Sequence, residues 1–398
     1  MTPTTVGLIL LAVPLGLFAY AYLIYPAILR LLALLRPTPP AITDPREWPP
    51  ISISLPAYNE EGSIRETLEA LLAIDYPADR RQIVVISDAS TDRTDDIVRE
   101  FAGRGVELLR LPARAGKTAA ENAVASHLRG EIVVNTDATI RIPPGALKPL
   151  IRVFQDPTIG VASGRDISVG RLDVEANQGE SGYVGYEMWL RALETRVGSI
   201  VGASGCFYAI RRPLVNALFP EALSRDFASP LRARQHGYRT VSVDEAVCLV
   251  PRTTSLQAEY RRKIRTMARG LETLWYQREL MNPIRYGAFA WMLISHKLCR
   301  WLVHLTLPLV LVGLALLAPA YPVAAVLLVC SAVGLGVGWI VLQRFGDDRI
   351  PAPLALAGFV VAVNVAALAA WGRAFRGERN PIWEPTRRPG SVTAPGPN

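Results

Sequence analysis

Two long apolar regions flank a charged middle, and they restrict the possible fold more than any other feature of this sequence. Residues 6–35 carry no charge before Arg30, and residues 288–371 are again mostly apolar. A helix that crosses a bilayer needs about 20 apolar residues. We therefore expect an N-terminal transmembrane helix within residues 1–36, C-terminal transmembrane helices within residues 301–372, and a polar tail over residues 373–398.

The distribution of arginine indicates how these segments are oriented. Arg30 and Arg36 follow the first apolar region, so the positive-inside rule places the next domain in the cytoplasm. We expect a multi-pass protein of the cell (inner) membrane. The side of the tail stays open, because four spans would place it outside whereas the arginines within residues 373–398 favour the inside.

Composition restricts the classes of partner. The formal net charge is +8, and this basic excess fits phosphate and membrane lipid beside apolar spans, so no nucleic-acid partner is expected. The four cysteines lie far apart, which argues against a zinc site or a disulfide framework. Residues 37–50 are rich in proline and predict a stiff linker, and residues 259–300 predict basic amphipathic and interfacial helices.

The middle of the chain alternates short apolar runs with amphipathic ones. Strands are predicted at 51–55, 82–87, 106–109 and 132–134, and helices after Ser63, at 94–101 and from Gly116. Ser63 and Glu66 fit a capping box for the first of these helices, and Asp92 is expected to cap the second. This alternation predicts an α/β domain with a parallel, doubly wound sheet over residues 51–258.

Polar side chains follow these strands at the points where the strands end. Tyr58 and Glu60 follow the first strand, Asp88 the second, and Asp137 the fourth, while Lys117 opens a helix. In an open α/β sheet, ligands bind at the carboxyl ends of the strands, so these residues can face one crevice. For Asp137 alone, a turn or capping role is the competing interpretation.

These residue types match the chemistry of a sugar nucleotide. A carboxylate can accept hydrogen bonds from the base or ribose, a divalent cation with Lys or Arg can hold the diphosphate, and a further carboxylate can take the proton of the attacking hydroxyl. Arg211 and Arg212 end a stretch rich in small residues, and they could either clamp the diphosphate or face anionic lipid.

The order and spacing of these residues resemble the membrane-bound, inverting glycosyltransferases of family 2, whose catalytic domain has the GT-A fold, a Rossmann-like, mostly parallel sheet. The resemblance covers roughly residues 51–274, and the flanking spans are also similar. It implies that four residues hold the nucleoside of the donor: Pro56, Tyr58, Glu60 and Asp88. It also implies that Lys117 is the family's lysine after the third strand.

The family's metal-binding Asp-x-Asp motif resembles Asp137-Ala-Thr139, with Thr139 in place of the second acid. The resemblance implies that Asp137 binds a divalent cation, Mg²⁺ or Mn²⁺, together with the donor diphosphate. One carboxylate can serve because Mg²⁺ often keeps several waters.

The family's Thr-Glu-Asp motif resembles Ser224-Arg225-Asp226, which implies that Asp226 is the catalytic base. Its Gln-x-x-Arg-Trp motif resembles the stretch from Arg262 to Thr266, which implies that Arg262 and Arg265 lie near the donor diphosphate. Thr266 stands where processive polymerases have Trp beside the acceptor, so long-chain elongation is less strongly indicated.

The sequence thus predicts transfer of a sugar from a nucleotide sugar, with a UDP-sugar as the expected donor, to a lipid-linked saccharide or a nascent polysaccharide. Transfer of one sugar to polyprenyl phosphate or another lipid is an alternative. A non-catalytic scaffold that binds nucleotide sugars is a second alternative, and Thr139 is its only support in the sequence.

Overall fold

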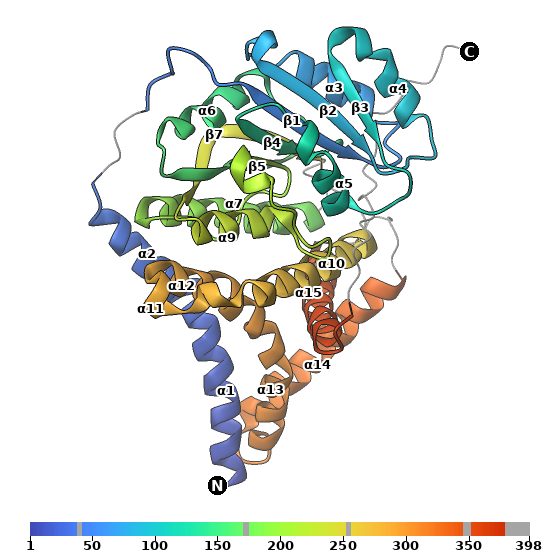
Figure 1. Ribbon diagram of the computed structural model, residues 1–398. Coiled ribbons are helices and arrows are strands. Elements are labelled where there is room, and N and C mark those ends of the chain that lie inside the picture. The colour runs from blue at the N-terminus through green and yellow to red at the C-terminus, as the bar shows by residue number, and fades with distance from the viewer. Residues whose placement is uncertain (38–41, 170–174, 252–255, 345–351, 379–398) are drawn as a thin grey trace. The chain divides into compact units, whose positions relative to one another are not determined.

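The computed structural model describes residues 1–37, 42–169, 175–251, 256–344 and 352–378 (Figure 1). These residues divide into two compact units. The middle of the chain, mainly residues 42–169 and 181–251, forms an α/β unit, and the described parts of 1–36 and 256–378 form a helical unit.

A seven-stranded sheet is the framework of the α/β unit, with strand order β3-β2-β1-β4-β6-β5-β7. β1 pairs in parallel with β2 and β4, β2 pairs in parallel with β3, and β5 pairs in parallel with β7. Only β6 is antiparallel to its neighbours β4 and β5. The strands are β1 (Ile51–Ala57), β2 (Arg81–Ser87), β3 (Val106–Arg110), β4 (Ile132–Thr136), β5 (Ile159–Val169), β6 (Phe207–Arg211) and β7 (Arg239–Pro251).

The reversed strand β6 brings a distant segment to the functional edge of the sheet. β1, β2 and β4 end at the same edge because they are parallel. Phe207 begins β6 opposite Thr136, the last residue of β4. The residues just before β6 therefore lie beside those just after β4.

Helices cover both faces of the sheet. On one face, α3, α4 and α6 pack against alternate strand residues such as Ile53, Val85 and Val134, and on the other, α5, α8 and α9 pack against Val84, Val133 and Ile210. This alternation is that of a sheet buried on both sides. The helices are α3 (Ile64–Leu72), α4 (Thr94–Glu100), α5 (Lys117–Ala123), α6 (Leu147–Arg152), α7 (Glu175–Val197), α8 (Arg212–Val215) and α9 (Arg225–Gln235).

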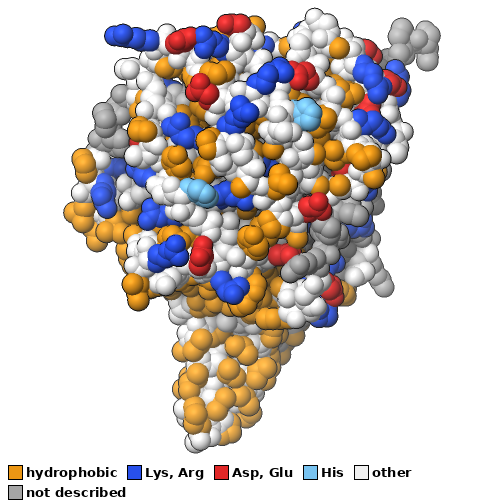
Figure 2. All heavy atoms as spheres, viewed as in Figure 1, with side chains coloured by type: hydrophobic (Ala, Val, Ile, Leu, Met, Phe, Trp, Pro, Cys, Tyr) orange, Lys and Arg blue, Asp and Glu red, His pale blue; other side chains and the backbone are white. Residues whose placement is uncertain are grey.

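The helical unit contains four helices that are long and apolar enough to cross a membrane, judged by length and composition: Pro3–Leu34, Ala288–Leu317, Pro322–Val341 and Ala357–Phe375. Hydrophobic side chains gather on the surface formed by α1 and α13 (Figure 2). The elements are α1 (Pro3–Ala19), α2 (Tyr25–Leu34), α10 (Leu256–Tyr276), α11 (Pro283–Tyr286), α12 (Ala288–Leu293), α13 (Arg300–Leu317), α14 (Pro322–Arg344) and α15 (Ala352–Phe375).

The second of these segments, Ala288–Leu317, runs across the boundary that was expected at residue 300 between interfacial and spanning helices. α12 continues into α13 through a π-helix, Ile294–Cys299, so residues 288–317 form one run of helix. A second π-helix, Tyr20–Ile24, lies between α1 and α2. Tyr20 joins the two, because its hydroxyl lies 2.7 Å from Ser295 Oγ and accepts a hydrogen bond from Trp291 Nε1 at 3.0 Å.

Candidate active site

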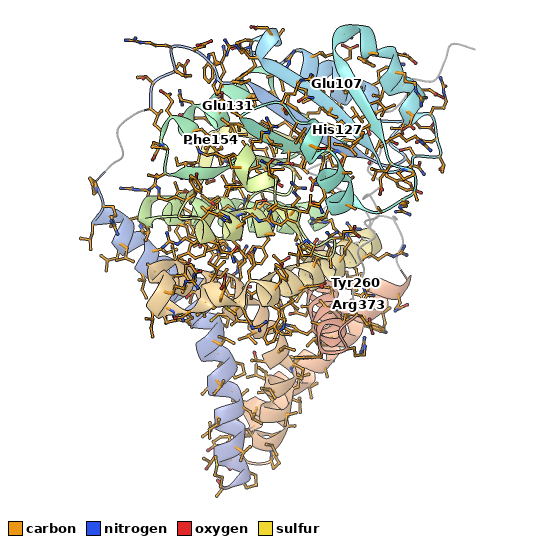
Figure 3. The ribbon with its side chains drawn as sticks, viewed as in Figure 1. Glu107, His127, Glu131, Phe154, Tyr260 and Arg373 are labelled. Atoms are coloured by element: carbon orange, nitrogen blue, oxygen red, sulfur yellow. The ribbon has the colours of Figure 1, made fainter. Side chains whose placement is uncertain are left out.

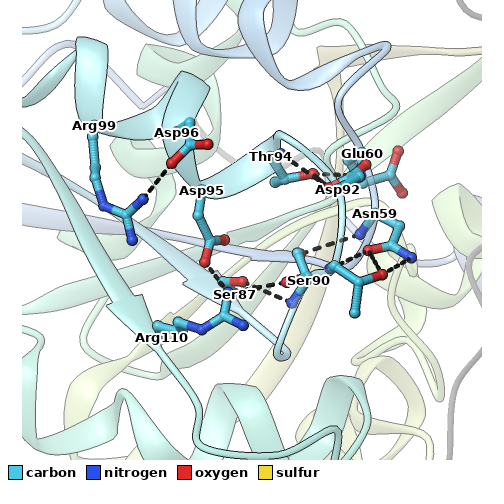
Figure 4. Close-up of polar contacts among 11 residues, drawn as sticks. Asn59, Glu60, Ser87, Ser90, Asp92, Thr94, Asp95, Asp96, Arg99 and Arg110 are labelled. Atoms are coloured by element: carbon cyan, nitrogen blue, oxygen red, sulfur yellow. Dashed lines mark hydrogen bonds and ion pairs between the residues drawn. The ribbon is translucent and has the colours of Figure 1, made fainter.

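The loops that follow β1 and β2 are bonded to each other (Figure 4). The Asn59 N–H donates to Ser90 Oγ at 3.2 Å, and the Glu60 N–H donates to Thr94 Oγ1 at 2.8 Å. Asn59 and Ala89 have left-handed backbone conformations, with φ of 53° and 57°, and among the described residues they are the non-glycine residues that do so. Such backbone strain clusters at ligand sites.

Tyr58 and Glu60, two of the predicted nucleoside-binding residues, lie on the first of these loops. Pro56 is near the end of β1, and the half-buried ring of Tyr58 follows it. The Arg114 guanidinium carbon lies 4.0 Å from the centre of the Tyr58 ring, a cation–π contact. The Glu60 carboxylate accepts a hydrogen bond from Ser63 Oγ at 2.9 Å, so it holds the start of α3.

The expected capping contacts around these loops are formed in part. Asp92 Oδ1 accepts a hydrogen bond from the Thr94 N–H at 3.0 Å, but the N-cap residue of α4 is Arg93, so Asp92 bonds the first helical residue from one position before the cap. Ser63 makes no side-chain capping bond to α3, so the predicted capping box with Glu66 is wrong. The Ser63 hydroxyl donates to the Glu60 carboxylate, and the Glu66 carboxylate lies 3.4 Å from Arg141 Nη2 instead of reaching back to Ser63.

Asp88 fixes the loop that carries the lysine. Its two carboxylate oxygens accept hydrogen bonds from the backbone N–H groups of Ala115 and Gly116, at 2.7 and 2.9 Å. Gly116 has a φ of 96°, a conformation that suits glycine. α5 begins at the next residue, Lys117. Asp88 therefore fixes the backbone position from which the Lys117 side chain extends.

Lys117 joins the end of β4 to the segment before β6. Its ammonium donates to Asp137 Oδ1 at 2.5 Å and to the carbonyl oxygen of Gly205 at 3.2 Å. Burial acts to lower the pKa of Lys117, but the carboxylates of Asp137 and Glu121 outweigh it and raise the pKa above its ordinary value. Lys117 is therefore a fixed positive charge at the carboxyl edge of the sheet.

Asp226 lies against the same glycine. It is in the first turn of α9, and its Oδ1 accepts a hydrogen bond from Ser224 Oγ at 2.6 Å. A β-carbon placed on Gly205 would lie 3.1 Å from Asp226 Oδ2. Asp137, Lys117 and Asp226 thus meet around Gly205, where a carboxylate, an ammonium and a second carboxylate flank one small backbone surface.

Sequence reasoning did not single out Gly205 or Glu121. Gly205 lies in the stretch of small residues before β6, and only the antiparallel pairing of β6 with β4 brings it to Asp137. Glu121 is 1% exposed on α5, and its Oε2 lies 3.6 Å from Arg225 Nε. Burial raises the pKa of Glu121, although Arg225 and Lys117 act against this.

Residues 52–219 match the sequence family described as glycosyl transferase family 2. These residues are a glycosyltransferase family 2 domain.

Curated relatives are similar over parts of their length. The chain is 39% identical over 98 residues to the probable glycosyltransferase YdaM of Bacillus subtilis, 23% of each protein. It is 27% identical over 251 residues to an N-acetylglucosaminyltransferase of Mesorhizobium japonicum, covering 57% of this chain and 58% of the relative. It is 32% identical over 206 residues to the undecaprenyl-phosphate 4-deoxy-4-formamido-L-arabinose transferase of Edwardsiella ictaluri, covering 48% and 58%. Each match spans less than two thirds of the relative.

A solved structure confirms the fold class. The mannosyltransferase PcManGT from Pyrobaculum calidifontis, solved in complex with GDP-Man and Mn²⁺, superposes with a TM-score of 0.72 and 24% sequence identity. The match covers 95% of this chain and 100% of that one. The family 2 domain therefore has the predicted GT-A fold, a mostly parallel sheet with flanking apolar helices.

Two further residues that were predicted to bind the donor belong to the helical unit. Arg262 and Arg265 lie on α10, both partly exposed, whereas the family 2 domain lies in the α/β unit. Their assignment to the donor diphosphate stays a prediction.

Arg211 lies at the opposite edge of the family 2 domain from Asp137. It ends β6 opposite Ile132, the first residue of β4, and its guanidinium donates to the carbonyl oxygens of Ile159 and Phe154, both at 2.7 Å. An open cavity of about 420 Å³ at this edge is lined in part by Arg211 and Glu131. Glu131 and Phe154 are labelled in Figure 3. Because the Arg211 guanidinium binds carbonyl oxygens of its own domain, at the edge opposite to Asp137, the geometry argues against the diphosphate clamp, and the lipid-facing alternative stays a prediction.

Proposed function

We propose that this protein transfers a sugar from a nucleotide sugar, with a UDP-sugar as the expected donor, to an acceptor hydroxyl, with inversion at the anomeric carbon. One observation carries the proposal: the Lys117 ammonium bonds both Asp137 Oδ1 and the Gly205 carbonyl, and Asp226 lies against Gly205. Lys117 as the proposed phosphate-binding ammonium, Asp137 as the proposed metal ligand and Asp226 as the proposed base therefore lie around the same glycine, Gly205.

The reaction is a single displacement. The Asp226 carboxylate takes the proton of the acceptor hydroxyl as that oxygen forms a bond to the anomeric carbon. The bond from this carbon to the diphosphate breaks, and its electron pair leaves with the nucleoside diphosphate. Attack from the side opposite to the leaving group inverts the configuration. The Lys117 ammonium stabilises the negative charge that develops on the leaving oxygen, and Arg265 of α10 is proposed to assist it.

Asp137 is the proposed ligand of a divalent cation, Mg²⁺ or Mn²⁺. The described residues contain no group of three His, Cys, Asp or Glu side chains that could hold a metal alone. The Asp137 side chain is 19% exposed at the edge of the sheet, and Mg²⁺ is commonly bound by one or two carboxylates together with substrate phosphates. The residues therefore fit a cation that arrives with the donor. When bound, such an ion offsets the charge of the diphosphate.

The nucleoside is proposed to bind at the loops after β1 and β2. Tyr58 offers an aromatic face for the base, Pro56 lies near the end of β1 just before it, and the Glu60 carboxylate bonds Ser63 at the start of α3. Asp88 is retained as a nucleoside-binding residue in this proposal. Because its oxygens already accept two backbone N–H groups, we assign its main effect to the position of the lysine loop.

The acceptor is proposed to be a lipid-linked saccharide or a nascent polysaccharide at the cytoplasmic face of the cell membrane. The four apolar helices support a location in membrane lipid. Transfer of one sugar to polyprenyl phosphate is the second candidate, and it is favoured by the similarity to the undecaprenyl-phosphate transferase of Edwardsiella ictaluri.

A donor panel tests the proposed function. Full-length protein in native lipid is incubated with nucleotide sugars and Mg²⁺ or Mn²⁺, and the release of nucleoside diphosphate is measured. We expect release with one donor class, and thin-layer analysis separates a lipid product from a polymer. Nucleotide-sugar binding without release for any donor would contradict the proposal and favour the scaffold alternative.

A further inference from the structure

Two opposite charges are buried beside the candidate active site. Glu121 on α5 is 1% exposed and Arg225 on α9 is 5% exposed. Arg225 Nε lies 3.6 Å from Glu121 Oε2, and within the described parts of the chain neither oxygen of Glu121 accepts a hydrogen bond. A buried charge is costly unless an opposite charge accompanies it, so each of these residues depends on the other.

The ion pair belongs to a larger set of contacts between α5 and the segment that leads into α9. Thr118 Oγ1 donates to the carbonyl oxygen of Leu223 at 3.0 Å, and Asn122 Nδ2 donates to that of Phe219 at 2.7 Å. Arg225 Nη1 also donates to Asn122 Oδ1 at 3.4 Å. α5 therefore binds the chain just before Asp226 at several points along its length.

These contacts join α5, which carries the proposed donor-binding residue Lys117, to α9, which carries the proposed base Asp226. Lys117 lies one turn before Glu121 on α5, on the donor side. Asp226 directly follows Arg225, on the acceptor side. The donor end of α5 has its own supports, because Asp88 holds the loop before it and Asp137 holds the Lys117 ammonium. The Asp226 end is held by the hydrogen bond from the Ala203 N–H to the Asp226 carbonyl oxygen at 3.1 Å and by the contacts with α5, of which the Glu121–Arg225 pair lies next to Asp226.

We propose that the buried Glu121–Arg225 ion pair sets the position of Asp226 relative to Lys117, so that both are positioning residues for sugar transfer. This inference rests on the proposed function. Loss of one partner leaves an unpaired buried charge that drives the first turn of α9 away from α5, whereas loss of both removes the charge imbalance.

The test is a double-mutant cycle in the full-length protein, using Glu121→Gln, Arg225→Gln and the double variant. Active sites are counted by titration with nucleoside diphosphate and Mg²⁺, and kcat for transfer is expressed per binding site. We expect each single variant to keep its nucleotide affinity but to lose at least about tenfold in kcat, because small displacements of a reacting group are costly. The double variant should recover to within about threefold of the wild type, since the two residues act as a pair.

Arg232 provides a matched control on the same helix. It is 9% exposed and stacks on the Phe219 ring at 3.2 Å, compared with 5.1 Å for Arg225, but its guanidinium donates to the carbonyl oxygens of Leu214, Ala217 and Leu218. Arg232→Gln should lower the melting temperature and leave kcat per binding site unchanged. That split separates a positioning role from general destabilisation.

The outcomes distinguish the two proposals. Single variants with wild-type kcat per site, or losses that multiply in the double variant, would overturn the positioning role and leave the proposed function intact. A wild-type protein that transfers no sugar would remove both. If a single variant does not fold, Glu121→Asp replaces it, because it keeps the charge and withdraws the carboxylate by one methylene. The same loss of kcat is then expected, and wild-type kcat would overturn the positioning role.

Discussion

Gly205 shows how much of the site depends on the size of one residue. Its carbonyl accepts a hydrogen bond from Lys117, and its α-carbon faces the Asp226 carboxylate. Any side chain here would enter the space between the ammonium and the proposed base. The absence of a side chain at this position is therefore part of the site's chemistry.

Gly205→Ala should impair transfer more than it impairs folding. The added methyl group would lie 3.1 Å from Asp226 Oδ2, closer than ordinary packing allows, so the carboxylate must move. We expect kcat to fall about tenfold, with nucleoside diphosphate affinity retained. Gly198→Ala is the control from the same stretch, because nothing lies within 4 Å of its added methyl group. Equal kcat values for the two variants would contradict the placement of Asp226.

Thr139 permits a gain-of-function prediction. It is half-buried two residues after Asp137, where a second acid would complete an Asp-x-Asp motif. Because cation affinity rises with the number of charged ligands, Thr139→Asp should bind Mn²⁺ severalfold more tightly in the presence of nucleoside diphosphate. Calorimetry measures the affinity, with Thr139→Asn as the uncharged control. Unchanged affinity in Thr139→Asp would place the cation elsewhere.

At the scale of elements, the parallel half of the sheet is what the sequence predicts well. Each of its strands is a short apolar run that ends in polar residues, so β1, β2, β3 and β4 and the acids after them can be located from local pattern. The contribution of β6 could not be predicted, because its pairing with β4 joins residues 71 to 79 positions apart (Thr136 with Phe207, Ile132 with Arg211) and no local pattern encodes it. The Glu121–Arg225 ion pair could not be predicted either, because its two residues lie far apart in the sequence and only the fold brings them together.

Gly130 tests the pairing of β1 with β4. A β-carbon there would lie 2.3 Å from the backbone carbon of Ile51 and the nitrogen of Ser52, and these backbone atoms cannot move without breaking the sheet. Gly130→Ala should therefore lower the free energy of unfolding by about 3 kcal/mol. Gly103→Ala, with nothing within 4 Å of the added methyl group, should change it by less than about 0.5 kcal/mol. Thermal unfolding of both variants decides between an obligatory glycine and a tolerant one.

At the scale of the whole molecule, a GT-A domain and a set of apolar helices share one chain. The apolar helices expose large side chains such as Leu8, Val13 and Leu15, which in water would form an unfavourable surface. The sequence predicted these spans because uncharged runs of this length are rare outside membranes. The division at residue 300 between interfacial and spanning helices stays a prediction, and no sequence signal marks the π-helix that joins α12 to α13.

Membrane extraction checks this arrangement. We expect the full-length protein to stay in the membrane pellet after an alkaline carbonate wash and to be released by detergent, because helices of 19–32 residues with this hydropathy insert rather than adsorb. A known peripheral protein in the same preparation serves as the control. Release by carbonate would mean that the helices do not cross the bilayer.

The most direct test of the central claim compares the wild type with Asp226→Asn in the full-length protein. Nucleoside diphosphate affinity is measured by calorimetry, and acceptor-dependent release of nucleoside diphosphate is measured with the preferred donor. Asparagine keeps the shape of the side chain but does not accept the proton, so the account predicts unchanged affinity and loss of transfer by at least about a hundredfold. Transfer at the wild-type rate in Asp226→Asn would contradict the account.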